Sequence, residues 1–275
     1  MADIKSNAYG KTRVRLTYVD RTCDPHEVRE LSVTILFEGE FTAAFKHGDN
    51  AGVLPTDTMK NSVYVLARQL RWDSIEILAQ GLAQHFLNLL PHLSHVTIKI
   101  DQIPWQQIGD NGAAFYQVGN ERRTTRLRAS RSAITISSGI KGLQIMKTAD
   151  SGFAGFMKDN FTTLPETHDR LFGTVLEAEW EYLQTELPFN DSHRDIRAIL
   201  LDCFAQHRSL SVQHTLFAMG QQVLDKVQAI AEVHLVMPNK HCLLVDLSRF
   251  GLDNPNQIFV PIDEPSGYIE ARIGR

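Results

Sequence analysis

Cysteine is scarce in this chain of 275 residues, which has only Cys23, Cys203 and Cys242. An odd number of widely separated cysteines excludes a disulfide framework and is typical of reduced thiols. Long apolar runs are lacking too, because the most apolar stretch, residues 75–90, contains several polar side chains and is too short to span a bilayer. The first residues lack the apolar core of a signal peptide, and the last three are Ile-Gly-Arg rather than a peroxisomal Ser-Lys-Leu. We therefore expect a cytoplasmic protein with no membrane partner.

An excess of charge of one sign is also missing. The chain carries 28 Lys and Arg against 32 Asp and Glu, a net charge of −4, so it has no global attraction to nucleic acid or anionic membranes. The local exception is a basic cluster, defined here as Arg122, Arg123, Arg126, Arg128 and Arg131. A basic stripe can bind nucleic acid. Because no aromatic residues alternate with these arginines, we favour a solvated sheet face or subunit salt bridges and predict no nucleic-acid partner.

Cofactor and metal motifs are absent from the sequence. No G-x-G-x-x-G follows a strand and no G-x-x-x-x-G-K-[ST] occurs, so nicotinamide, flavin and nucleotide-phosphate sites lack support. Neither C-x-x-C nor H-E-x-x-H is present, and the nearest histidine pair, His92 and His95, has no third ligand. We therefore predict no cofactor and no metal site.

What is present is a repeated pattern of strands and helices. Residues 12–20 and 32–45 alternate between apolar and polar positions, which predicts two antiparallel strands if a turn at Asp24-Pro25 closes a hairpin. Apolar residues at helical spacing predict helices that begin at Asp57, as a cap, and at Asp73 with Glu76, as a capping box. Strands are predicted again at 96–103 and 114–118, with the pairing of the last strand extended through 122–137. The first half therefore has the order ββααββ.

The second half repeats this order. It has predicted strands at 143–147 and 175–187, helices after residues 191 and 211, and strands at 233–236, 243–247 and 268–273. The fold class is thus α+β, with two tandem ββααββ units, residues 1–138 and 139–275, each an antiparallel sheet with helices on one face. Because such sheets leave long unpaired edges, we expect them to join, within and between subunits, into a closed barrel.

The candidate chemistry lies in short polar islands, each with a structural alternative. Lys11, after Tyr9-Gly10, is either a solvated charge or a base that desolvation makes available as the neutral amine. Pro55-Thr56-Asp57 is either a helix cap or an anion site, because a helix N-terminus presents free amides. Val212-Gln213 lies beside the free amides of a later helix. Pro238-Asn239-Lys240-His241 fits either a plain turn or a functional loop.

Together these islands resemble the urate oxidase (uricase) family over essentially the whole chain. The matching segments keep the family's order and approximate spacing: Tyr9-Gly10-Lys11, Pro55-Thr56-Asp57 with Lys60-Asn61, Phe153 to Arg170, Ser211-Val212-Gln213 and Leu235 to His241. The resemblance implies the tunnelling fold (T-fold), assembled as a homotetramer around a hollow barrel. It also implies oxidation of urate with O2 and water to 5-hydroxyisourate and hydrogen peroxide, with neither metal nor organic cofactor.

The resemblance further implies which residues do the chemistry. Lys11 and Thr56 would abstract a proton, through the threonine hydroxyl or an ordered water, and His241 would complete the relay. Phe153 would stack beneath the flat purine. Arg170 would grip a urate carbonyl and ring nitrogen with its planar fork.

Four further residues would complete the substrate site. Gln213 would pair with the opposite edge of urate, offering one donor and one acceptor. Val212 and Asp57 would contribute backbone amides, and Asn239 would face the oxygen or water site above the ring. In the family, the residues that match Thr56 and Asp57 come from the neighbouring subunit, so the site exists only in the oligomer.

Several alternatives stay open at this point. Another tunnelling-fold enzyme, similar to GTP cyclohydrolase, would need a zinc-binding Cys and His cluster. A non-catalytic purine-binding protein would bind urate without oxygen uptake. Among single residues, Phe153 could be a core anchor of a short helix and Arg170 half of a surface ion pair.

Overall fold

The first predicted hairpin is present in the structure, a computed structural model that describes residues 2–275. Strands β1 (Tyr9–Asp20) and β2 (Glu27–Gly39) pair antiparallel and turn at Asp24-Pro25, which confirms that prediction. One face of β2 is apolar at every second residue, and its side chains Leu31, Val33, Ile35 and Phe37 are at most 1% exposed. Alternation along β2 therefore places one face of the hairpin in a core.

The chain divides into two compact units. Unit 1 comprises residues up to Gly139 together with Glu181–His193, and unit 2 comprises Ile140–Trp180 together with Arg194–Arg275. Strand β7 (Ile134–Lys147) and helix α4 (Phe189–Gln206) each contribute residues to both units. The division of the sequence after residue 138 into two T-fold repeats stays a prediction.

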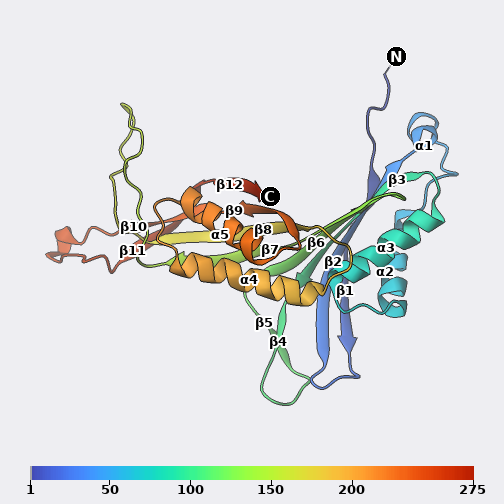
Figure 1. Cartoon of the computed structure of the whole chain (residues 1–275), viewed down its shortest axis with the longest axis horizontal. Helices are drawn as coiled ribbons and strands as arrows, with labels where there is room; N and C mark the ends of the chain where they lie inside the picture. Colours follow the sequence, from blue (N-terminus) through green and yellow to red (C-terminus); the bar gives the residue numbers. More distant parts are fainter. Residues whose placement is uncertain (1) are drawn as a thin grey trace. The chain divides into compact units, whose positions relative to one another are not determined.

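Unit 1 is an antiparallel sheet in the order β1-β2-β3-β6, continued by the start of β7. Strand β3 spans Leu93–Ile103 and β6 spans Arg122–Ala129. Helices α2 (Thr56–Gln69) and α3 (Ile75–Leu89) lie against this sheet, α2 on β1 and α3 on β3 and β6 (Figure 1). The α3 face that meets the sheet is fully buried at Leu78, Leu82 and Phe86, as the helical apolar spacing predicts.

Three predictions for unit 1 are wrong in detail. The strand predicted over 32–45 ends at Gly39, where a Cβ would lie 2.5 Å from a backbone oxygen, and the chain continues into helix α1 (Thr42–His47). The strand predicted at 114–118 belongs to a separate two-stranded sheet of β4 (Trp105–Gln107) and β5 (Phe115–Gln117). The strand predicted over 122–137 is two strands, because the chain turns at Ser130 between β6 and β7.

The predicted helix starts in unit 1 also differ. Pro55 occupies the cap position of α2, so Asp57 lies inside the first turn and caps nothing. Ser74 rather than Asp73 caps α3, and its hydroxyl accepts from the Ile77 amide. Proline is common at a helix start, and serine with extended backbone is a good cap. The spacing of apolar residues alone did not show which residue occupies the cap position.

Unit 2 centres on strand β8 (Phe172–Tyr182), which pairs with β7, with β9 (Ile230–Val236) and with β10 (Asn239–Leu244). Strand β11 (Phe259–Gly267) pairs with β10, and β12 (Glu270–Gly274) pairs with β9. Helix α5 (Val212–Lys226) packs on β9 and β12, and a short 3-10 helix η1 covers Ser248–Phe250. The alternation of apolar and polar residues did not predict strand β11.

A long excursion between β7 and β8 projects from unit 2, and it contains the predicted run from Phe153 to Arg170 (Figure 1). At its far end Met157 is 95% exposed and Phe161 is 89% exposed. Across residues 2–275, no helix is both long and apolar enough to cross a membrane.

Candidate active site

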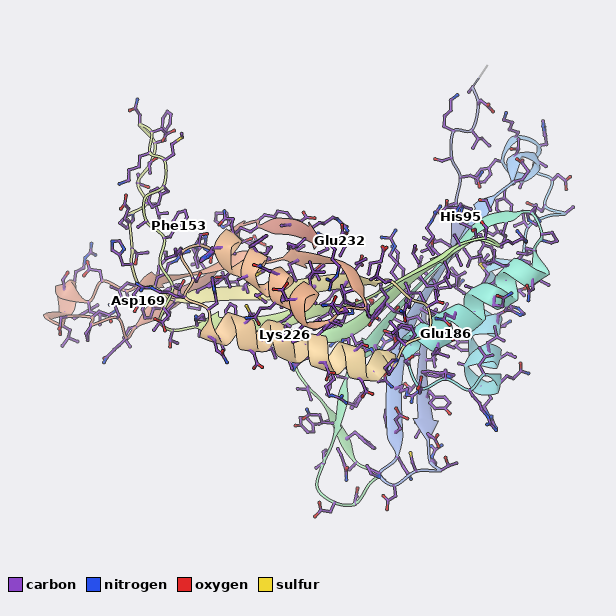
Figure 2. All side chains as sticks on the ribbon, in the orientation of Figure 1. His95, Phe153, Asp169, Glu186, Lys226 and Glu232 are labelled. Atoms are coloured by element: carbon purple, nitrogen blue, oxygen red, sulfur yellow. The ribbon has the colours of Figure 1, made fainter. Side chains whose placement is uncertain are left out.

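The excursion brings Phe153 and Arg170 together because its two arms pair at their base. The backbones of Phe153 and Thr167 exchange two hydrogen bonds, of 2.7 and 3.0 Å, and the Arg170 amide donates to the Ser151 carbonyl at 2.7 Å. Figure 2 shows Phe153 and Asp169 on these two arms. At Gly152 an added Cβ would lie 3.1 Å from the Thr167 oxygen, so glycine permits the close approach of the arms.

Arg170 carries its charge without a counter-ion. Its guanidinium carbon lies 5.4 Å from the centre of the Phe153 ring, and its Nε is buried with no hydrogen-bond partner among the described residues. Burial lowers the pKa of Arg170, although a guanidinium stays protonated at ordinary pH. Among residues 2–275 Arg170 makes no ion pair, so the surface ion-pair alternative is not seen.

Phe153 is half-buried in extended backbone and stands in no helix, so the helix-anchor alternative is wrong. One ring contact is a stack on Phe156, with centroids 4.8 Å apart and planes inclined by 14°. Its other neighbour is the charged Arg170 guanidinium. An aromatic face beside an unpaired cation is suited to a flat anion.

Asn239 and His241 stand two residues apart on β10, at a register irregularity in its pairing with β11. The Asn239 Nδ2 lies 3.3 Å from the His241 Nδ1. Both residues line, with Arg170, a cavity of about 450 Å³ in unit 2. The structure therefore brings the predicted substrate-gripping arginine and two predicted polar residues to one cavity.

Val212 and Gln213 form the first turn of α5 behind the Ser211 cap, whose hydroxyl accepts from the His214 amide at 3.1 Å. The first amides of a helix have no partner inside the helix, as the sequence predicted for this pair. Ser209 connects this turn to the excursion, since its amide donates to Asp150 and its carbonyl accepts from Gly152, both at 2.8 Å.

The remaining predicted residues, Lys11, Thr56 and Asp57, gather in unit 1. Thr56 is the first residue of α2 and is half-buried. The Lys60 ammonium, which bonds the Asp57 carboxylate, lowers the pKa of Asp57, with smaller effects from Asn61 and from the charge of Lys11. Lys11 therefore lies within electrostatic reach of the α2 N-terminus of its own chain.

Local backbone features set the position of Lys11. At Gly10 a Cβ would lie 1.9 Å from the Ile35 carbonyl oxygen, so only glycine fits beside β2. A bulge follows Lys11, and within it Arg13 has a φ of 58°, which is strained for a residue with a side chain. The Tyr9 hydroxyl accepts from the Leu54 amide at 3.1 Å and so ties β1 to the loop before Thr56.

Comparisons with known proteins show the family to which the chain belongs. A sequence model described as "Uricase" matches residues 7–128 and 136–270. The chain belongs to the uricase family. The uricase of Arthrobacter globiformis is 41% identical over 269 residues, which cover 98% of this chain and 89% of that protein. The uricase of Dictyostelium discoideum is 38% identical over 282 residues, covering 100% of this chain and 98% of that protein.

A solved structure supports the same assignment. The crystal structure of the Arthrobacter globiformis uricase has a TM-score of 0.97 to this chain at 40% identity, covering 100% of this chain and 96% of the other. This likeness confirms the predicted α+β T-fold class. Uricase membership also confirms the predicted enzyme class, an oxidoreductase of the urate oxidase type in purine degradation. Within residues 2–275, no three His, Cys, Asp or Glu side chains gather in a way that could hold a metal ion.

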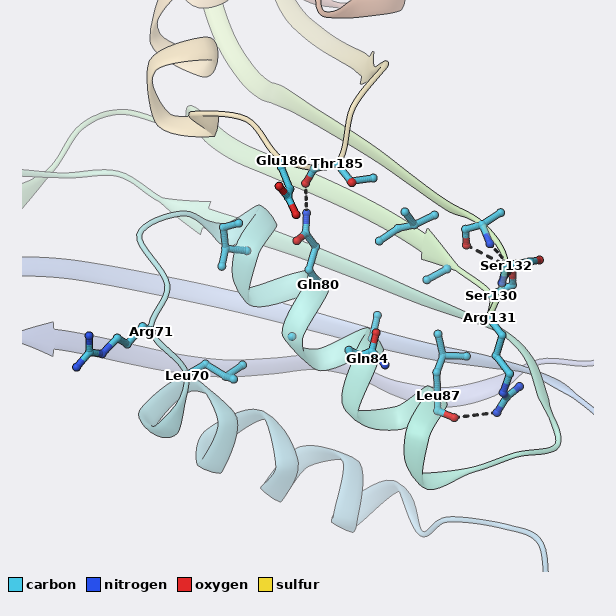
Figure 3. A pocket seen from close by; sticks show the side chains of 16 residues that line it. Leu70, Arg71, Gln80, Gln84, Leu87, Ser130, Arg131, Ser132, Thr185 and Glu186 are labelled. Carbon is cyan, nitrogen blue, oxygen red and sulfur yellow. Dashed lines mark hydrogen bonds between the residues drawn. The ribbon is translucent and has the colours of Figure 1, made fainter.

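Most of the basic cluster serves the fold of unit 1. Arg131 donates to the carbonyls of Leu87, Leu90 and Leu93 and so caps α3, on the wall of a second cavity of about 610 Å³ that contains none of the predicted site residues (Figure 3). Arg123 pairs with the fully buried Glu76 at 2.7 Å. Arg128 pairs with Glu38 at 2.9 Å. The sequence favoured either a solvated sheet face or salt bridges between subunits. The arginines do form salt bridges, but these lie within the chain.

Sequence reasoning missed the residues that hold the site residues in place. Tyr9 was recognised only as part of a motif, and its hydroxyl contact to Leu54 gave no sequence signal because the partners are 45 positions apart. Ser209, which connects the excursion to α5, and the buried Thr174 opposite Asn239 were not predicted. For Ser209 and Thr174 the sequence offered only a hydroxyl residue near a recognised motif, which does not by itself indicate a role.

Proposed function

We propose that this chain oxidises urate with O2 and water to 5-hydroxyisourate and H2O2, without metal or organic cofactor. The reaction balances: urate loses two electrons and gains the oxygen of water at C5, while O2 takes up the two electrons and two protons as H2O2. Uricase-family membership over nearly the whole chain supports this reaction. Proton removal from urate makes it a better electron donor, so the protein must supply a base and support for negative charge.

The observation that carries the proposal is the unpaired Arg170 beside Phe153. A half-buried cation whose Nε has no partner is stabilised when a ligand supplies a counter-charge and an acceptor. Here the missing partner must be planar enough to lie on a ring and carry acceptors for a guanidinium fork. The urate anion meets both requirements, with Gln213 and the Val212 amide proposed to bind its other edge.

The proton relay is proposed to consist of Lys11, Thr56 and His241. In unit 1, the charge of Lys11 acts on Asp57, next to Thr56, so these residues form one group on one chain. If Thr56 and Asp57 reach the site from a neighbouring subunit, Lys11 must come with them. The other subunit then contributes the group in unit 2, which consists of Phe153, Arg170, Asn239 and His241. Within that group, Asn239 is proposed to face the oxygen or water site.

A homotetramer is the proposed assembly. Within the described chain β1 pairs only with β2, so its outer edge has unpaired backbone groups that another strand can cover. The exposed Met157 and Phe161 of the excursion are further surfaces that favour burial by a second copy. A site made from two chains would be active only in the oligomer.

An aerobic urate assay with and without a metal chelator tests the proposed function. We expect oxygen uptake and peroxide formation in a one-to-one ratio with urate loss, unchanged by the chelator. Saturable urate binding without oxygen uptake would instead establish the purine-binding alternative. Activity that disappears on chelation and returns with zinc would favour the cyclohydrolase-like alternative.

A further inference from the structure

Thr174 on β8 has a hydroxyl that the fold buries without using. The residue is 0% exposed, and its Oγ1 has no hydrogen-bond partner among the described residues. Buried polar groups in native proteins are nearly always paired, because an unpaired one loses its bonds to water and gains nothing in return. The Thr174 hydroxyl therefore calls for a partner that side-chain rotation or a bound water can bring within reach.

The register of the sheet makes Asn239 the candidate partner. Strands β8 and β10 pair antiparallel, with Thr174 directly opposite Asn239 and Gly173 opposite Lys240. Residues directly opposite each other in an antiparallel pair share one face of the sheet, with Cβ atoms about 4.5–5.5 Å apart. A threonine hydroxyl and a carboxamide can bond over that separation, directly or through one water.

The carboxamide of Asn239 has a donor, Nδ2, and an acceptor, Oδ1, which can bond different partners. Its Nδ2 lies 3.3 Å from the His241 Nδ1, and because an amide NH2 can only donate, this contact favours the tautomer in which Nδ1 accepts and Nε2 carries the proton. With Nδ2 directed at His241, the Oδ1 is free to accept from another donor. A hydroxyl that donates to Oδ1 would prevent the amide from flipping, and a flipped amide would present an acceptor to Nδ1.

We propose that Thr174 is a positioning residue, whose hydroxyl bonds Asn239 Oδ1 and thereby holds His241 in the tautomer with its proton on Nε2. This inference rests on the proposed function, because it concerns the relay in which His241 takes part. Thr174 itself touches neither urate nor oxygen. Its effect reaches the reaction through the orientation of Asn239 and the proton position on His241.

The test compares Thr174→Val, Thr174→Ala and Thr174→Ser with the wild type, and uses Thr215→Val as a matched control. Thr215 is also 0% exposed with an unpartnered hydroxyl, but it lies on α5 and is not paired with a site residue. Turnover is measured at saturating urate and oxygen, and urate affinity is measured under nitrogen by difference absorbance. The anaerobic titration reports binding independently of catalysis.

We expect Thr174→Val and Thr174→Ala to lower kcat about fivefold to tenfold, the effect of one net hydrogen bond, with urate affinity little changed. Thr174→Ser retains the hydroxyl and should restore kcat to within about twofold, and Thr215→Val should match the wild type. Wild-type kcat in both Thr174 variants that lack the hydroxyl would overturn the inference, as would equal losses of turnover and affinity. A wild-type protein that binds urate but does not oxidise it would overturn the proposed function instead.

Discussion

The Arg170 guanidinium carbon lies 5.4 Å from the centre of the Phe153 ring, at the base of the excursion between β7 and β8. Their backbones are fixed by pairing of the two arms, so the cation and the aromatic face are held in place before any ligand binds. Preorganisation of this kind lowers the entropy that binding must overcome. Arg170 and Phe153 thus form the binding half of the proposed site.

Replacing Arg170 by lysine should mainly weaken urate binding. Lysine keeps the charge but loses the planar fork that can form two parallel hydrogen bonds. We expect KM for urate, and the anaerobic dissociation constant, to rise about tenfold or more, while kcat changes less. Arg128→Lys, at an exposed ion pair with Glu38, serves as the control and should leave both values unchanged. An unchanged KM in Arg170→Lys would contradict the assigned grip.

Lys11→Met and Thr56→Ala should each reduce turnover while urate still binds. If both residues act in general-base catalysis, the expected loss in kcat is about 10²-fold or more. Lys46→Met removes an exposed lysine that pairs with Asp3 and should leave kcat intact. The measurement is steady-state oxygen uptake with anaerobic urate titration beside it. Equal losses of binding and turnover would show a structural role instead.

Mixing two inactive variants tests whether the site is shared between chains. Lys11→Met damages the group in unit 1, and His241→Ala damages the group in unit 2. If one site takes Lys11 from one chain and His241 from another, random co-assembly of equal amounts should restore about one quarter of wild-type activity. Lys11→Met mixed with Thr56→Ala gives no intact site, because both residues belong to one chain's group. Full inactivity of both mixtures would place the whole site in a single chain.

How much of this could be predicted from the sequence depends on the range of each interaction. The alternation in β2 and the apolar spacing of α3 are local, and both predictions were confirmed. The ends of elements were less predictable: β2 ends at Gly39, where a backbone oxygen more than 50 positions away leaves no room for a side chain. Resemblance gave the site residues, but not the grouping of Lys11 with Asp57 on one chain.

The second half was harder for a similar reason. The residue pattern missed strand β11 because it contains Pro261 and Pro265, which argue against a strand, and because it is held by pairing with β10. Arg170 and Asn239 border one cavity only because β8 and β10 are neighbours in the sheet. Neither contact leaves a signal in a single sequence.

Glu76→Gln should destabilise the protein strongly without altering the site residues. Glu76 is 0% exposed and bonds both Arg123 and the Ser138 hydroxyl, so neutralising it leaves a guanidinium without its counter-ion. Removal of one partner from a buried pair costs about 3 kcal/mol or more. Glu38→Gln breaks an exposed pair and should cost at most about 1 kcal/mol. Urea unfolding midpoints compare the two variants, and equal losses would contradict the assigned burial effect.

His207 should make the protein less stable as the pH falls below about 6.5, the ordinary pKa of a histidine. Burial lowers the pKa of His207 in the folded chain, with further lowering by His214, whose ring nitrogen lies 3.2 Å away, and by Lys147. Between the folded and the unfolded pKa, the unfolded chain binds a proton that the folded chain does not, so the free energy of unfolding decreases with falling pH. Below the folded pKa this contribution no longer changes.

The variant His207→Asn removes this titration and should flatten the pH dependence of the unfolding free energy between pH 7 and 5. It also removes the bond to His214, which lowers stability at every pH, so the slopes and not the absolute values must be compared. His47→Asn, at an exposed histidine at the end of α1, controls for the loss of one histidine. Thermal unfolding at a series of pH values measures the slopes. A slope in His207→Asn equal to that of the wild type would mean that other groups cause the loss of stability in acid.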